Sequence, residues 1–228
     1  MLHGSIVSAD AHHTRADYQS LLRQRCTHET LCAWRGDRLV SKIALVSGER
    51  ALPRVAAVQI LSGKNSVPAP IPMHLRFLRE TLAYAGSAGG YAPANTVPAG
   101  NRVCVPDILD TPGPVFMQAH SVQICGWSLR FRKHGARRLS GGVLVTSETG
   151  SAPLRFTWEI EVMDALLPPP DAFPFTIELW QYPYSVAEYY GVEPFSQAHF
   201  DILRPMLLHY KQMGGRAVTA SIVEEAWG

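Results

Sequence analysis

The feature that most constrains the fold is an alternation of apolar and polar residues from position 154 to 162. Its apolar members stand at every second position. Successive side chains of a β-strand point to opposite faces, so a period of two predicts a strand with one buried and one solvated face. The pattern places Trp158 in the core of a sheet and leaves Glu159 and Glu161 in water.

Other short apolar runs, separated by Gly, Pro, Asn and Ser, predict further strands. They lie at residues 42–47, 55–61, 71–78, 121–129 and 143–147. Residues 86–114 are rich in Pro and Gly, show no period and predict a long loop. Asp107 and Asp110 near its end are interpreted as a polar turn rather than a catalytic carboxylate pair. We therefore expect a β-sandwich over residues 31–170, preceded by a polar lead-in over residues 1–30.

A second pattern, near the C-terminus, predicts a βαβ unit. Residues 175–180 form an apolar run that indicates a buried strand, and Ser196 can cap a helix behind it. The apolar residues of this helix recur at three- and four-residue spacing, as a buried face requires: Phe200, Leu203, Leu207 and Tyr210. Gly214 and Gly215 favour the end of the helix, and residues 217–223 indicate a second strand. A helix between two strands implies that the strands are parallel.

Composition and charge exclude several function classes. The chain has 228 residues, of which 46% are hydrophobic and 18% charged, as in a globular protein. Residues 1–170 hold 18 basic and 12 acidic residues (net +6), whereas residues 171–228 hold 3 and 7 (net −4). This asymmetry favours a domain boundary near residue 170 over a nucleic-acid surface. We expect no membrane segment, because no apolar run approaches the ~20 residues that a membrane helix needs, and we see no signal peptide. The sequence does not indicate the cellular compartment in which the protein is found.

No cluster of residues predicts a metal site or a cofactor. His12 and His13 are adjacent, so their side chains point apart on a strand or a helix. The four cysteines, Cys26, Cys32, Cys104 and Cys125, lack both C-x-x-C spacing and a disulfide pattern, and are interpreted as ordinary thiols. The tripeptide Arg35-Gly36-Asp37 matches the integrin motif, but we interpret it as a turn.

Several stretches resemble glycoside hydrolase family 123 and its relatives. LWQYPYSVAEYYGVEPFSQAHF (residues 179–200) and VTASIVEEAW (218–227) are similar to the opening of the family's catalytic barrel, and EIEVMDALLPPPDAFPF (159–175) is similar to the seam between its sandwich and that barrel. Residues 33–47 and 105–110 match more loosely, and FRKHGARRLSGG (131–142) departs from the family's turn at this place. The resemblance implies a mainly β fold: an N-terminal β-sandwich, then an incomplete βαβ start of a (β/α)8 barrel over residues 171–228.

The resemblance also implies where a sugar would bind. Barrel active sites lie at the C-terminal ends of the strands. There we expect Trp180, Gln181 and Tyr184 after the first strand, and Glu224 and Trp227 after the second. Aromatic rings beside amide and carboxylate groups suit a sugar. The alternative is that Trp180 and the tyrosines cover the seam between the two domains.

The same resemblance assigns no catalytic residue to this chain. In the family, an adjacent Asp-Glu pair on a later strand performs substrate-assisted cleavage of an N-acetyl-β-galactosaminide. That pair lies beyond residue 228, and its roles do not transfer to Glu224 or Glu225. We therefore expect the N-terminal portion of a glycoside hydrolase-like protein, inactive by itself and prone to self-association through its incomplete barrel. The alternative is a non-catalytic sandwich module that binds carbohydrate or protein.

Overall fold

The chain divides into two compact units, Met1–Leu166 and Leu167–Gly228. The computed structural model describes residues 1–62, 67–68, 73–84, 102–110, 113–131, 138–148 and 152–221. The sequence predicts a boundary near residue 170, and the structure places the division a few residues earlier. Each unit is described separately.

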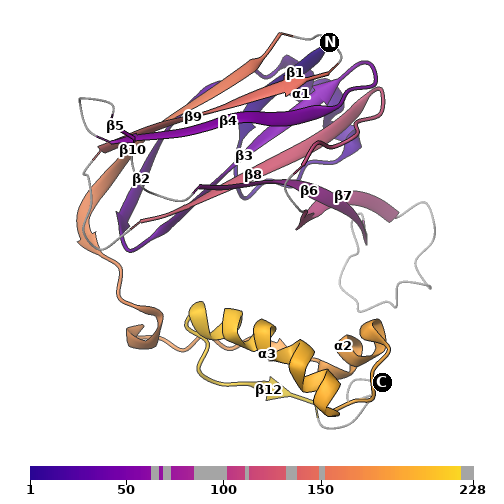
Figure 1. The fold of residues 1–228 in the computed structure, drawn as a ribbon, viewed down its shortest axis with the longest axis vertical. Coiled ribbons are helices and arrows are strands. Elements are labelled where there is room, and N and C mark those ends of the chain that lie inside the picture. Colours follow the sequence, from indigo (N-terminus) through magenta and orange to yellow (C-terminus); the bar gives the residue numbers. More distant parts are fainter. Residues whose placement is uncertain are drawn as a thin grey trace. The chain divides into compact units, whose positions relative to one another are not determined.

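The first unit is built from two β-sheets, drawn as two layers in Figure 1. In the described residues, one sheet has the order β1-β3-β8-β6-β7 and the other has the order β2-β10-β9-β4-β5. The first sheet comprises β1 (Leu2–Val7), β3 (Arg38–Ser47), β8 (Ser121–Arg130), β6 (Met73–Tyr84) and β7 (Arg102–Leu109). The second comprises β2 (His28–Arg35), β10 (Leu154–Leu166), β9 (Arg138–Ser147), β4 (Pro53–Ser62) and β5 (Val67–Pro68). Neighbouring strands are antiparallel, except that β2 runs parallel to β10.

The two sheets pack face to face around one apolar core. Both sheets contribute side chains with almost no exposure, among them Leu45 and Trp127 from the first and Phe156 and Trp158 from the second. A smaller buried cluster lies on the other face of the first sheet, where Leu21 packs with residues of β3 and β8. The first sheet therefore buries residues on both faces.

The alternation at residues 154–162 behaves as expected. Phe156, Trp158 and Ile160 are at most 1% exposed, whereas Arg155, Glu159 and Glu161, at alternate positions, are exposed. Residues of β10 pair with β9 on one side and β2 on the other, so this strand lies inside the second sheet. The predicted strands at 42–47, 55–61, 121–129 and 143–147 all fall within observed strands.

Residues 1–30 are not a lead-in outside the sheets. The strand β1 pairs with β3 from Leu2 opposite Ser47 to Val7 opposite Lys42. A short helix, α1 (Tyr18–Arg23), follows, and its Leu21 is 2% exposed. The sequence pattern did not indicate this strand, because the residues around it are polar and Gly4 interrupts its apolar run. An added Cβ at Gly4 would lie 2.7 Å from the ring of Phe156, so the close approach across the core requires glycine there.

The predicted loop at residues 86–114 is wrong in its second half. Residues Arg102–Leu109 form β7, which pairs with β6 in an antiparallel manner. Asp110, at the end of β7, forms an ion pair with Arg79 of 2.6 Å, and its backbone N–H donates to the carbonyl of Phe77. The polar residue at this strand end thus has a structural role. Residues 85–101 lie outside the described residues.

The tripeptide Arg35-Gly36-Asp37 is a turn that carries the chain from the second sheet to the first. Gly36 has a φ of +86°, which favours glycine. One Asp37 carboxylate oxygen accepts a 2.7 Å hydrogen bond from the backbone N–H of Arg38. The Arg35 guanidinium pairs with Asp164 at 3.2 Å. Asp37 therefore stabilises the turn through a backbone hydrogen bond, and Arg35 stabilises its surroundings through an ion pair with β10.

In the second unit, two helices stand between two short parallel strands in chain order, and Figure 1 labels both helices and the second strand. The strand β11 (Trp180–Gln181) pairs with β12 (Thr219–Ala220), and α2 (Pro183–Tyr190) and α3 (Gln197–Gln212) lie between them in the chain. The predicted parallel pairing is confirmed, and so is the cap on α3, where the Ser196 side chain accepts from the backbone N–H of His199. Gly214, with a φ of +99°, ends the helix as predicted.

Three details of the second unit differ from expectation. Within the described residues, the strands are shorter than the apolar runs at 175–180 and 217–223, because outside β11 and β12 these residues share only a bridge between Ile177 and Gly215. Residues 222 and 223 of the second run lie outside the described part. The predicted helix face is shifted, since Phe200 is 47% exposed whereas His199 is fully buried. The helix α2 was not predicted, although Pro183 at its first position and Gly191 after its end are typical helix boundaries.

The sequence predicts neither a metal site nor a membrane segment, and the described residues can be compared with both expectations. Nowhere within them do three or more His, Cys, Asp or Glu side chains gather as a metal site would require. In the same parts of the chain, every helix is too short or too polar to span a bilayer. All four cysteines are free thiols, and only Cys125 is buried.

Candidate functional site

The site predicted from the sequence begins where β11 ends. Gln181, the last residue of β11, donates a side-chain amide hydrogen to the carbonyl of Leu179 at 2.9 Å. Tyr182 follows as the residue before α2 and is 41% exposed, and the hydroxyl of Ser185 donates to its carbonyl. Pro183 begins α2, which turns the chain away immediately after the strand. The end of β11 therefore presents an amide and an accessible phenol ring.

Tyr184 joins these groups through aromatic packing. Its ring lies 6.0 Å from that of Tyr182 and meets Phe195 edge on, with 5.3 Å between centroids and 88° between planes. Tyr184 is half-buried. Aromatic pairs with this geometry are favourable beyond the area that they bury. Phe195, in the turn between α2 and α3, thus fixes the position of one ring of the candidate site.

Phe195 itself is held by a buried histidine. It has a φ of +60°, a left-handed conformation that is uncommon for a residue with a side chain. Its backbone N–H donates to Nδ1 of His199 at 2.8 Å. The His199 ring is fully buried, and its Nε2 has no hydrogen-bond partner in the part of the chain described. In the neutral ring the hydrogen is then on Nε2, which leaves Nδ1 free to accept.

Tyr210 connects the segments that lead into the two parallel strands. Its hydroxyl accepts from the backbone N–H of Leu179 at 3.2 Å and lies 2.8 Å from the carbonyl oxygen of Ile177 and 2.7 Å from that of Ala217. The hydroxyl carries one hydrogen, so it donates to one of these carbonyls at a time. A Cβ at Gly215 would lie 2.3 Å from the Tyr210 ring. Gly215 is therefore required by this packing, whereas Gly214 ends the helix.

The structure places only part of the predicted site. Gln181 and Tyr184 lie on either side of Tyr182, at the end of β11 and the start of α2. The backbone of Trp180 is in β11, but its side chain is outside the described part. Glu224 and Trp227 also lie outside the described residues.

Two residues of α3 support this site: His199, which the sequence analysis missed, and Tyr210, which it placed on the buried helix face without a hydrogen-bonding role. His199 and Tyr210 are both buried polar side chains on α3, and each holds a loop or strand through a hydrogen bond. Helical spacing contained a signal for His199 as well, because positions 199, 203, 207 and 210 form a stripe on one face. Because Phe200 is more hydrophobic than His199, the sequence analysis assigned Phe200 to the buried face instead.

Comparison with known proteins identifies the relatives of this arrangement. The model of the glycoside hydrolase 123 catalytic domain matches residues 180–228, which begin at β11. A solved family 123 glycoside hydrolase from Clostridium perfringens, described for glycolipid glycan hydrolysis, matches with a TM-score of 0.84 and 27% identity over 100% of this chain. The chain is similar to family 123 glycoside hydrolases. It spans 39% of the length of the C. perfringens family 123 enzyme.

Two further solved structures are much less similar to this chain. A PapD-like domain of human CEP192 matches with a TM-score of 0.30 and 12% identity, over 62% of this chain and 84% of that one. The CooA pilin subunit from enterotoxigenic Escherichia coli matches with a TM-score of 0.33 and 10% identity, over 72% and 99%. No curated protein matches the chain. These two likenesses are too weak to bear on function.

Proposed function

We propose that the chain is the N-terminal portion of a glycoside hydrolase-like protein, in which a β-sandwich supports a sugar-binding (β/α)8 barrel. The observation that carries the proposal is the likeness to the C. perfringens family 123 enzyme over the whole chain. The two packed sheets correspond to the sandwich in this proposal. The parallel pair β11 and β12, with helices between them, corresponds to the first and second barrel strands.

The sugar site lies at the C-terminal ends of these two strands in this proposal. Five residues line it: Trp180, Gln181, Tyr184, Glu224 and Trp227. The position of Gln181 at the end of β11 supports it, as does the packing that holds Tyr184. An amide beside aromatic rings offers both fixed hydrogen bonds and an apolar surface for the C–H face of a sugar.

The chain alone does not complete the chemistry in this proposal. In family 123 the acid and the residue that steadies the substrate's acetamido group come from an adjacent Asp-Glu pair on a later barrel strand. The coding sequence after Gly228 tests this. We expect further βα units with an adjacent Asp-Glu pair, and a stop codon directly after Gly228 would contradict the proposal and favour a non-catalytic module.

The enzymatic test uses 4-nitrophenyl N-acetyl-β-galactosaminide. Residues 1–228 should give no turnover above background, whereas the longer product should hydrolyse the substrate. In that longer product, Gln181→Ala should raise KM about tenfold, the cost of one lost substrate hydrogen bond, with a smaller change in kcat. The matched control is Gln212→Ala, because Gln212 is exposed at the far end of α3 and should leave both constants unchanged. Turnover by residues 1–228 that is lost in Glu224→Gln would overturn the assignment of catalysis to later strands.

A further inference from the structure

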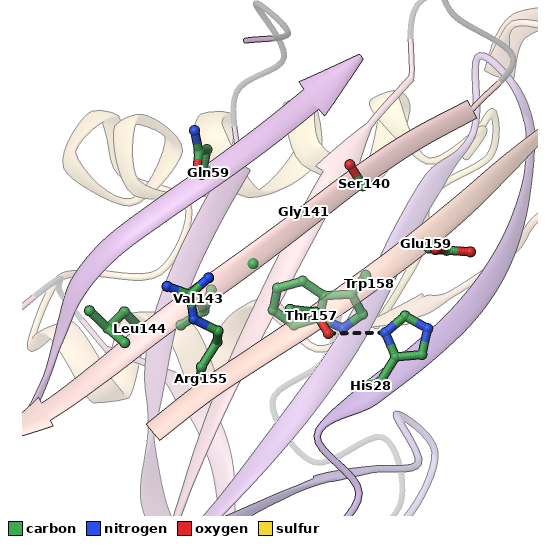
Figure 2. A pocket seen from close by; sticks show the side chains of 11 residues that line it. His28, Gln59, Ser140, Gly141, Val143, Leu144, Arg155, Thr157, Trp158 and Glu159 are labelled. Carbon is green, nitrogen blue, oxygen red and sulfur yellow. Dashed lines mark hydrogen bonds between the residues drawn. The ribbon is translucent and has the colours of Figure 1, made fainter. Parts of the chain in front are cut away.

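A hollow opens on the outward face of the second sheet, on the side away from the core. Its volume is about 360 Å³, and residues of β2, β4, β9 and β10 line it (Figure 2). Small-molecule sites have volumes of roughly 300–1,000 Å³, so the hollow is large enough for a small ligand. Nothing in the proposed barrel site uses this surface, which belongs entirely to the first unit.

A glycine in the middle of the sheet creates the hollow. Gln59, Gly142, Thr157 and His28 are direct neighbours across four strands, and directly paired residues share one face of a sheet. Gly142 therefore leaves a gap between the side chains of Gln59 and Thr157. A Cβ at Gly142 would lie 3.1 Å from the backbone carbonyl oxygen of Phe156, which is tighter than an ordinary contact. Backbone packing thus maintains the gap.

The rim of the hollow carries hydrogen-bonding groups of every kind. Arg155 and Glu159 stand two residues to either side of Thr157 on β10, so all three point outward. Ser140 pairs with Glu159, and Leu144 pairs with Arg155 and adds an apolar wall. Neither Arg155 nor Glu159 has a hydrogen bond or ion pair with the described part of the chain.

One rim position is already fixed. Nδ1 of His28 and the hydroxyl oxygen of Thr157 are 3.0 Å apart and hydrogen bonded, as Figure 2 shows. The Thr157 hydroxyl also lies 3.4 Å from the carbonyl of Thr27. Since β9 and β10 are inner strands, the floor of the hollow is held by hydrogen bonds on both sides. The site is therefore largely formed before a ligand arrives.

We propose that this hollow binds a neutral sugar ring. Sugar hydroxyls both donate and accept, and the rim offers a pure donor in Arg155, a pure acceptor in Glu159, and groups that do both in Gln59 and Ser140. Leu144 can cover part of an apolar ring face. Such an accessory site would hold a glycan on the first unit, separately from the proposed barrel site.

The same groups disfavour other ligand classes. An anion would meet the carboxylate of Glu159, and a cation would meet Arg155, whose charge is permanent. A peptide strand that extends a sheet needs a free edge, whereas β9 and β10 are paired on both sides. A nucleobase would need an aromatic surface, whereas the ring of Trp158 points into the core, where it meets Trp127, and is 1% exposed.

The test is a titration of the ¹⁵N-labelled full chain with galactose, N-acetylgalactosamine and glucose, and with inorganic phosphate as the anion probe. We expect at least one sugar to shift the amides of Gln59, Gly142 and Thr157. Thr157→Val and Glu159→Gln should each weaken its binding about tenfold, because each removes about one hydrogen bond. Valine retains the β-branched shape that suits a strand.

The matched control is Glu161→Gln, on the same outward face of β10 but outside the hollow, and its affinity should equal that of the unmodified chain. Three results would overturn the proposal: no sugar shifts these amides, phosphate shifts them more strongly than any sugar, or Glu161→Gln weakens binding as much as Glu159→Gln. Shifts at Gln181 and Tyr184 report the proposed barrel site independently, so the two proposals fail separately.

Discussion

The indole rings of Trp127 and Trp158 meet edge to face between the two sheets, with ring centroids 4.6 Å apart and planes inclined by 68°. Trp127 belongs to β8 and Trp158 to β10, so this pair joins inner strands of opposite sheets. Both rings are 1% exposed. Neither indole N–H has a hydrogen-bond partner within the described residues. The pair contributes packing rather than polar contacts to the core.

Trp158→Ala should lower the free energy of unfolding by about 3–5 kcal/mol, because it opens a cavity in a closely packed core. Chemical denaturation followed by circular dichroism measures this loss. Trp158→Phe should cost clearly less, since it keeps an aromatic ring and removes a donor that no described group satisfies. A loss below about 1 kcal/mol for Trp158→Ala would show that this ring does not organise the core.

Gly214→Ala should destabilise the second unit more than Gly191→Ala. Both glycines end helices with positive φ, +99° and +62° respectively. A Cβ at Gly214 would also lie 2.8 Å from the ring of Phe173, whereas a Cβ at Gly191 would meet nothing within 4 Å. We expect a loss of about 1 kcal/mol at Gly191 and a larger loss at Gly214. The measurement is chemical denaturation, monitored through spectroscopic signals of residues in the second unit. A larger loss of stability for Gly191→Ala than for Gly214→Ala would contradict this prediction.

The matched pair His199→Asn and His199→Gln tests how Phe195 is held. Asparagine can place its side-chain oxygen near the position of Nδ1 and accept from the Phe195 N–H, whereas glutamine places its polar group farther out. We expect His199→Gln to cost about 1 kcal/mol more stability and to shift the ring signals of Tyr184, because Phe195 packs against that ring. NMR spectra of the aromatic protons provide the measurement. Equal stability and equal Tyr184 signals in the two variants would remove this role from His199.

Cys125 should resist alkylation until the first unit unfolds. Burial raises the pKa of its thiol from an ordinary value of 9.0 to about 12. The thiolate is the reactive form, so Cys26, Cys32 and Cys104, which are exposed, should react first. The raised pKa also makes folding pH-dependent: its contribution is intact below about pH 9 and is lost as the pH rises toward 12, where the unfolded chain ionises first. Mass spectrometry after timed labelling should find three modified cysteines in the native protein; four at the same rate would contradict the burial.

The second unit should exchange its amide hydrogens faster than the first. The strand β12 consists of two exposed residues, Thr219 and Ala220, and pairs only with β11 in the described part of the chain. Leu179 and Val218 nearby are 46% and 57% exposed, which favours self-association. Hydrogen exchange should protect β10 more than β12. Equal protection in a demonstrated monomer would show that the second unit is a self-sufficient fold.

Local patterns in the sequence were sufficient where neighbours along the chain set the structure. The alternation around Trp158 determines which face of β10 is buried, because side chains of a strand alternate wherever the strand lies. The Ser196 cap and the Gly214 end of α3 were readable for the same reason, since each depends on backbone groups within one helical turn. The parallel pairing of β11 and β12 followed from the helix between them.

Only the tertiary structure decided the features that depend on distant partners. The strands β1 and β7 carry no clear period, and pairing with β3 and β6 supplies the hydrogen bonds that make them strands. His199 is buried because its ring accepts from the Phe195 turn, a contact that hydrophobic spacing does not encode. The hollow over Gly142 arises from four strands that the chain brings into register, with His28 opposite Thr157 and Gln59 opposite Gly142. Local sequence determines which way a side chain points, whereas long-range pairing determines what it meets.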